Sequence, residues 1–210
     1  MNIRKYLTGL IMLCFSWVAV AEVNPAPTEV SPVSVEEPEV DVVDLMLSAG
    51  ITIGGEDLAT TTSGITVSTG GLIYLAAGAV WHASSNFDVQ GSFGYHFDSV
   101  SATNGTAEFT RKFIELVPFY VAESGYRFGV GFTQILSPSF SSPFGGEPEF
   151  KDAAGMIFEI DWPLSRKSYI GVRYADITYD SSKGLIKMPN GDLKSSLDGN
   201  YIGLMIQANF

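Results

Sequence analysis

From Asp44 onward, apolar residues alternate with polar or small residues along the chain. In the first stretch, Leu45, Leu47, Ala49, Ile51 and Ile53 alternate with Met46, Ser48, Gly50, Thr52 and Gly54. Between Phe87 and Asp98, aromatic residues and Val dominate one parity, while Asp, Gln, Ser, Gly and His fill the other. Successive side chains of a strand point to opposite faces, so this pattern predicts strands that separate an apolar from a polar environment.

Seven further segments follow the first one. The eight expected strands lie near residues 45–54, 71–81, 87–98, 108–121, 126–136, 153–162, 169–179 and 201–210. A length of about ten residues fits a tilted strand that crosses a membrane. A membrane-spanning helix needs about 18 consecutive apolar residues, and no such run occurs after the N-terminus.

The expected connections alternate between short and long. Residues 83–86, 122–125 and 165–167 form short turns, whereas 55–70, Ser99–Ala107, 137–152 and 181–200 are longer and rich in Gly, Ser, Thr and Asn. Outer-membrane barrels have short periplasmic turns and long external loops, and a soluble β-sandwich has no reason for such alternation. The sequence predicts an all-β fold: a closed up-and-down antiparallel transmembrane β-barrel of about eight strands, with both barrel ends of the chain in the periplasm.

The last segment, YIGLMIQANF, places Ile202, Leu204, Ile206, Ala208 and Phe210 on one face and ends on an aromatic residue. This ending resembles the C-terminal signal that the barrel assembly machinery recognises. Residues 44–210 as a whole resemble the small eight-stranded outer-membrane barrels of the OmpA and OmpX type. The resemblance lies in architecture and terminal motif, so it implies an assembly role for Phe210 and assigns no other functional residue.

The N-terminal 43 residues have a different character. Residues 1–21 carry Arg4 and Lys5, an apolar run and the sequence Ala-Val-Ala, which predicts a cleaved secretory signal. An N-terminal anchor helix is the alternative, and lipidation at Cys14 is disfavoured by the bulky Leu13. Residues 22–43 are acidic and proline-rich, which predicts a disordered periplasmic leader that acts as a spacer or as a docking arm. The expected location is the cell outer membrane of a Gram-negative bacterium.

If the apolar faces meet lipid, the other parity points into the barrel and carries many ionisable groups. These are Asp88, His96, Asp98, Arg111, Glu115, Arg127, Glu159, Asp161 and Arg173. Eight strands leave an interior that side chains fill, and buried charges need partners. We therefore expect an interior ion-pair network of Glu115, Arg127, Glu159, Asp161 and Arg173 that plugs the barrel. A gated conduit for very small solutes or protons is the alternative.

No convincing catalytic, cofactor or metal motif is present. His82 with Ser84 or Ser85 resembles the His-x-Ser pairing of lipid A deacylases, but the expected topology places these residues at a periplasmic turn, away from the outer leaflet. Six aromatic residues beside the short turns are expected to form an interfacial girdle: Trp81, Tyr120, Tyr126, Trp162, Tyr169 and Phe210. Cys14, the one cysteine of the chain, would leave with the signal.

The charge of the chain narrows the choice of partners. Loss of Arg4 and Lys5 with the signal would leave 10 basic against 23 acidic residues, a net charge near −13 that disfavours nucleic acid. Expected partners are outer-membrane lipid and lipopolysaccharide, the barrel assembly machinery and an unidentified external ligand, with the protein as a monomer. The sequence favours a non-enzymatic structural or surface-interaction role through the external loops. A narrow channel and a lipid A-modifying enzyme are the alternatives.

Overall fold

The computed structural model describes residues 42–60, 64–102, 105–143, 148–189 and 191–210, and eight long strands dominate it. They are β1 (Val43–Gly54), β4 (Ile73–Ser84), β5 (Phe87–Ala102), β6 (Gly105–Val121), β7 (Arg127–Ser141), β8 (Ala153–Ser165), β9 (Ser168–Asp180) and β13 (Tyr201–Asn209). The expected secretory signal and almost all of the expected leader lie outside the described residues. Among the residues described, no helix is long and apolar enough to cross a membrane.

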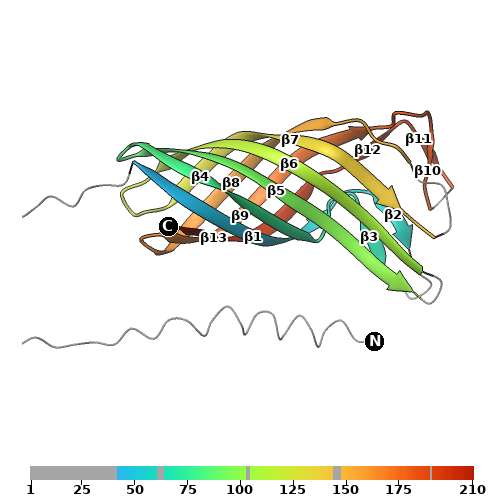
Figure 1. Cartoon of the computed structure of the whole chain (residues 1–210), viewed down its shortest axis with the longest axis horizontal. Coiled ribbons are helices and arrows are strands. Elements are labelled where there is room, and N and C mark those ends of the chain that lie inside the picture. The colour runs from blue at the N-terminus through green and yellow to red at the C-terminus, as the bar shows by residue number, and fades with distance from the viewer. Residues whose placement is uncertain (1–41, 61–63, 103–104, 144–147, 190) are drawn as a thin grey trace, which may run out of the picture. The chain divides into compact units, whose positions relative to one another are not determined.

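The eight strands close into a ring (Figure 1). Each is antiparallel to its neighbours, and β1 closes the barrel against β13, from Met46 opposite Asn209 to Gly54 opposite Tyr201. Closure leaves no free sheet edge, and in lipid an unpaired backbone edge would be very costly. The prediction of a closed up-and-down antiparallel barrel of eight strands is confirmed.

The two ends of the barrel differ. At one end lie the start of β1, the end of β13 and three short connections, 85–86, 122–126 and 166–167; we call it the turn end. At the other, the loop end, lie five short strands that the sequence did not predict. They are β2 (Asp57–Thr60), β3 (Thr66–Ser68), β10 (Ile186–Lys187), β11 (Leu193–Lys194) and β12 (Ser196–Asp198).

The prediction of a long loop over Ser99–Ala107 is wrong. β5 and β6 remain paired as far as Ala102 opposite Gly105, so the strands themselves form most of this segment. Val100 and Ala107 are buried along this extension. The outward positions there are polar, such as Ser99 and Ser101, so the strong apolar alternation of the membrane segment is missing although the strand continues. β1 also begins at Val43, one residue before the predicted boundary.

The outside of the barrel is an apolar belt. Leu47, Leu116, Phe132 and Leu204 are 55–65% exposed, so these large side chains face the barrel's surroundings and not its core. On β6 the outward charged residue nearest the belt is Lys112, and on β9 it is Asp176. Between these positions and the short turns, none of the described outward positions of the eight strands is charged. An apolar band around a closed barrel is the surface that spans an outer membrane.

The aromatic girdle is mostly where the sequence places it. Trp81, Tyr120, Tyr126, Trp162 and Phe210 are exposed at the turn end. Tyr169 is the exception, because it shares the inward parity of β9 with Arg173, and the Arg127 guanidinium carbon lies 3.8 Å from the centre of its ring. The expectation of an interfacial Tyr169 is therefore wrong, and the residue instead packs inside the barrel mouth.

Candidate functional site

The barrel interior contains three buried arginines at different heights, and Arg173 of β9 is the one that forms ion pairs with two carboxylates. Its Nη1 lies 2.8 Å from Oε2 of Glu115 on β6, and its Nη2 lies 2.6 Å from Oε2 of Glu159 on the neighbouring β8. The hydroxyl of Tyr74 on β4 donates to the same Glu115 oxygen at 2.8 Å, and its ring stacks on Phe113. These bonds tie four strands together across the lumen.

Arg127 at the start of β7 forms the layer nearest the turn end. Its Nε and Nη2 donate to Oδ2 of Asp161 at 3.0 and 2.7 Å, and the register places the two residues directly opposite each other on β7 and β8. Phe119 and Tyr169 place their rings against the guanidinium, with centroids 4.5 and 3.8 Å from its carbon. Paired charge and ring packing together fill the barrel at this height.

The structure therefore divides the five predicted network residues into two groups, Arg127 with Asp161 and Arg173 with Glu115 and Glu159. The two groups meet on β8, because the carboxyl groups of Glu159 and Asp161 lie two residues apart on the buried face of that strand and interact with each other. All five side chains are at most 4% exposed, so neither group is open to bulk solvent. Breaking a buried pair of this kind costs about 3–5 kcal/mol, because the remaining charge stays buried without a partner.

Arg111 of β6 forms the third layer, below the loop end, and its surroundings differ. Among the described residues, no carboxylate forms an ion pair with it. Its guanidinium donates to the carbonyl of Thr69 at 2.6 Å, to the ring of His96 and to the hydroxyl of Tyr179. The rings of Phe109, Tyr179 and Tyr201 surround it, with centroids 5.2–5.9 Å from its central carbon.

A chain of hydrogen bonds fixes the His96 ring. Arg111 Nε has only hydrogens to offer, so Nδ1 of His96, 3.1 Å away, accepts. The other ring nitrogen, Nε2, then carries the proton and donates to Thr52 Oγ1 at 2.7 Å, and Thr52 donates to the carbonyl of Gly71 at 2.9 Å. This arrangement requires a neutral imidazole, since a doubly protonated ring could not accept from Arg111.

The described parts of the first long connection, residues 55–60 and 64–72, fold over this end of the lumen. Val67 and Thr69 are completely buried, and Thr69 Oγ1 donates to the carbonyl of Asp198 at 2.5 Å. The backbone nitrogen of Ser68 donates to Asp98 at 2.9 Å. We call this segment the cap, and sequence reasoning missed it because its short polar stretch has no periodicity that distinguishes an inward fold from an exposed loop.

His82 lies at the turn end between two carboxylates. Its Nδ1 is 2.7 Å from Asp88, its Nε2 is 3.4 Å from Asp44, and Lys167 binds Asp44 at 3.0 Å. Ser84 and Ser85 instead bond within the turn: Ser84 accepts from the Asn86 backbone, and Ser85 donates to the Asn86 side chain. A nucleophile must lie within hydrogen-bond reach of its base, so the structure brings together no His–Ser pair here.

Several buried polar atoms of the lumen have no hydrogen-bond partner among the described residues. They are Nη1 of Arg127, both side-chain polar atoms of Gln90 and Oγ1 of Thr133. Buried polar groups are ordinarily satisfied by protein or by internal water. The lumen beside these side chains therefore has places for single water molecules.

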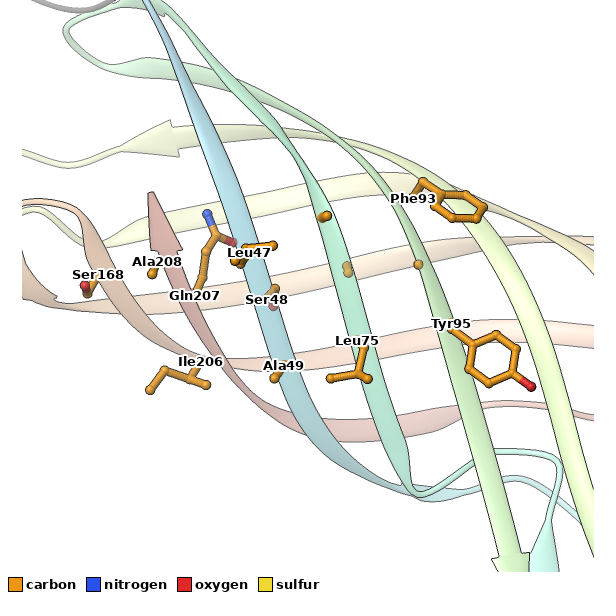
Figure 2. A pocket seen from close by; sticks show the side chains of 13 residues that line it. Leu47, Ser48, Ala49, Leu75, Phe93, Tyr95, Ser168, Ile206, Gln207 and Ala208 are labelled. Atoms are coloured by element: carbon orange, nitrogen blue, oxygen red, sulfur yellow. The ribbon is translucent and has the colours of Figure 1, made fainter. Parts of the chain in front are cut away.

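The described surface has an apolar and a polar depression. On the lipid-facing side of β13, β1, β4 and β5, a shallow apolar depression of about 630 Å³ is lined by residues such as Ala49, Leu75, Tyr95 and Ile206 (Figure 2). Its position within the belt makes it part of the membrane-facing surface.

No group of three or more His, Cys, Asp or Glu in the described ranges could hold a metal ion.

The second depression lies at the loop end and is polar. It has a volume of about 570 Å³, and its walls include Glu56, Thr178, Lys194 and Asp198. Lys194 forms an ion pair with Glu56, and this hydrogen bond raises the pKa of the Lys194 ammonium group. The exposed Leu185 and Leu193 stand on its rim.

No protein-family model matches the chain, and no curated protein matches it. Its fold is similar to solved structures of small barrels. Ail, the attachment invasion locus protein of Yersinia pestis, solved with the heparin analogue sucrose octasulfate, is 12% identical with a TM-score of 0.42. Neisserial surface protein A is 11% identical with a TM-score of 0.46. Both matches cover 80% of this chain and 97% of the other.

The outer membrane protein OprG from Pseudomonas aeruginosa is 14% identical with a TM-score of 0.43, over 80% of this chain and 94% of that one. At such identities the likeness concerns the fold. The environment follows from the barrel itself, because a closed antiparallel ring with an apolar belt and a charged, packed interior suits one kind of membrane. The chain is an outer-membrane β-barrel. Because outer-membrane barrels have short periplasmic turns and longer external loops, we expect the turn end to face the periplasm and the loop end to face the outside.

Proposed function

We propose that this chain is a non-enzymatic outer-membrane protein that acts structurally or in surface interactions through its external loop end. The observation that carries the proposal is the contrast between the two parts of the barrel. The lumen is crossed by three arginine layers with bulky rings between them, whereas the loop end has ordered hairpins and a polar depression. Binding residues are commonly presented by loops on a rigid scaffold.

The β10–β11 hairpin is the part of the loop end best suited to a test. The backbone nitrogen of Ser181 donates to the carbonyl of Ser195 at 2.9 Å, so the chain can be rejoined there with a short Gly-Ser turn after removal of 182–194. The matched control replaces the 122–125 turn at the opposite end. Cells carrying each variant are compared for retention on immobilised glycans and host-surface proteins and for resistance to detergent.

We expect the hairpin deletion to abolish retention and the turn replacement to preserve it, at equal surface amounts. If neither changes retention but loss of the whole barrel makes cells detergent-sensitive, the structural half of the proposal stands alone. Barrel-dependent flux of small solutes into liposomes, or a changed lipid A mass when the gene is deleted, would contradict it. The proposed molecular partners are lipopolysaccharide and outer-membrane lipid on the belt and the assembly machinery at Phe210, with the protein monomeric.

A narrow channel is the second candidate function, and the unpartnered polar atoms of Gln90, Thr133 and Arg127 favour it. A file of water molecules beside these atoms would be the shortest route for protons through the barrel. The channel hypothesis can be tested by measuring proton flux into liposomes that contain a pH-sensitive dye. The Gln90→Leu variant is the comparison, because it removes two of the unpartnered polar atoms. If the wild-type barrel conducts protons and the Gln90→Leu variant conducts fewer, the channel function would be favoured over the surface-interaction proposal.

A further inference from the structure

Arg111 is a buried cation that forms no ion pair with any carboxylate of the described residues. It is 1% exposed, and the groups that contact it are neutral: His96, Tyr179 and the backbone carbonyls of Thr69 and Gly70. Arg127 and Arg173 each face a carboxylate at 2.6–2.8 Å. A buried charge without a countercharge is costly, so a barrel that needed only packing at this height would be more stable with a neutral side chain.

The positions that an anion would take are occupied by the cap. The carbonyl oxygen of Thr69 lies 2.6 Å from Nη1 of Arg111, and the carbonyl oxygen of Gly70 lies 3.4 Å from Nη2. With one oxygen on each terminal nitrogen, the two carbonyls approximate the fork arrangement by which a guanidinium binds a carboxylate, although Nη2 also lies 2.5 Å from Nδ1 of His96. Two separate carbonyl dipoles occupy this fork without neutralising its charge.

Glycines stand near both ends of the cap, and one threonine provides hydrogen bonds that a substitution can remove. Gly55 and Gly71 bound it, with φ angles of +73° and +70°, a region that glycine adopts without strain. Between them, Thr69 holds the cap through its hydroxyl, which donates to the Asp198 carbonyl at 2.5 Å and accepts from the Glu56 nitrogen at 2.7 Å. Thr69 thus supplies two of the hydrogen bonds that hold the cap, alongside the bond from the Ser68 nitrogen to Asp98.

We propose that Arg111, with Tyr179 and the surrounding rings, is a binding site for a small carboxylate at the outer end of the lumen, and that the cap occupies this site as an internal competitor. A carboxylate fits better than a phosphate, because Asp98 is buried on the same inward face of β5, two residues from His96, and repels a dianion more strongly. This site names a ligand class that the proposed surface role does not include.

The test uses the full mature barrel in detergent and acetate as the probe. Binding is followed by NMR from the side-chain Nε–H of Arg111 and from the backbone amides of Gly70 and Gly71. Acetate should give saturable shifts at these groups, and inorganic phosphate should bind more weakly. Thr69→Val loosens the cap and leaves Arg111 in place, so we expect acetate to bind about fivefold more tightly, the effect of losing about one net hydrogen bond.

The matched control is Thr60→Val on the exposed part of the β2–β3 hairpin, which should leave acetate binding unchanged. Arg111→Met should abolish the saturable shifts. Arg111→Lys keeps the charge but loses the fork, so it should fold and bind acetate more weakly even where Arg111→Met fails to fold. The proposal is overturned by shifts that never saturate, by phosphate binding more tightly than acetate, or by an unchanged or weaker affinity in Thr69→Val.

Discussion

Arg173 shows at the scale of one residue why the interior is sealed. Its guanidinium holds two carboxylates and one phenol from three other strands, and its carbon lies 4.8 Å from the centre of the Tyr74 ring. Replacing Arg173 with Met would leave Glu115 and Glu159 buried together without a cation. We expect a loss of about 3–5 kcal/mol in the free energy of unfolding, measured by urea titration in detergent.

The control for this loss is Arg166→Met, because Arg166 lies exposed in the short turn between β8 and β9. It should change the free energy of unfolding by less than about 0.5 kcal/mol. The triple variant with Glu115→Gln, Glu159→Gln and Arg173→Met removes all three charges and should recover part of the loss. Equal stability of the single Arg173 variant and the wild type would show that water replaces the arginine at no cost.

Phe210, the last residue of the chain, is the residue to which the proposed assembly signal assigns a role. Its backbone pairs with Leu45 in both directions at 3.2 and 2.9 Å, and its ring is 64% exposed on the belt side. We expect Phe210→Asp to reduce the amount of barrel in the membrane, because the terminal aromatic belongs to the proposed assembly signal. Tyr120→Asp is the control, since Tyr120 is a similarly exposed aromatic at the turn end. Equal yields of the two variants would assign the defect to charge on the lipid face alone.

At the scale of elements, the membrane explains which strands could be predicted from the sequence. Lipid on one side and a packed interior on the other impose strict alternation, as in Phe87–Asp98, so all eight strands were predictable. Beyond the belt both faces of a strand meet polar surroundings, and the alternation weakens where the strand continues. This is why the pattern predicts a loop over Ser99–Ala107, and why β2, β3 and β10–β12 cannot be recognised as strands from the sequence.

The sequence predicts which residues face the interior but not which of them pair with each other. Inward parity identifies Arg111, Arg127 and Arg173 as lumen residues, but their pairing depends on the stagger between strands, which alternation does not encode. The pairing of Arg111 with the Thr69 carbonyl is further removed from the sequence, because a backbone acceptor leaves no signature in side-chain type. The neutral state of His96 follows from the hydrogen bond that Arg111 Nε donates to its Nδ1, a contact that the sequence does not encode either.

The leader is the element whose removal the barrel should tolerate. The first contacts of β1 are local to the turn end, where the backbone of His82 donates to the carbonyl of Val42 at 2.9 Å and Val43 lies opposite Trp81. A chain that begins at Val42 should refold in detergent with the same β-rich circular dichroism and the same midpoint in urea as one that begins at Glu22. A lower midpoint would mean that residues 22–41 brace the barrel.

For the whole molecule, the decisive property is whether the lumen conducts ions. Eight strands enclose a space that side chains fill, and here Tyr74, Phe113 and Met205 are at most 2% exposed alongside the arginine layers. The cap adds a second closure at the outer end. The purified barrel in planar bilayers should therefore show no discrete, reproducible conductance, and the Thr69→Val variant, which loosens only the cap, should also show none.

Arg173→Met is the informative variant, because loss of the central layer should permit brief, irregular openings if it folds. Steps in the wild type that scale with salt concentration would show a continuous aqueous path, and the interior charges would then have to be assigned to selectivity instead of packing.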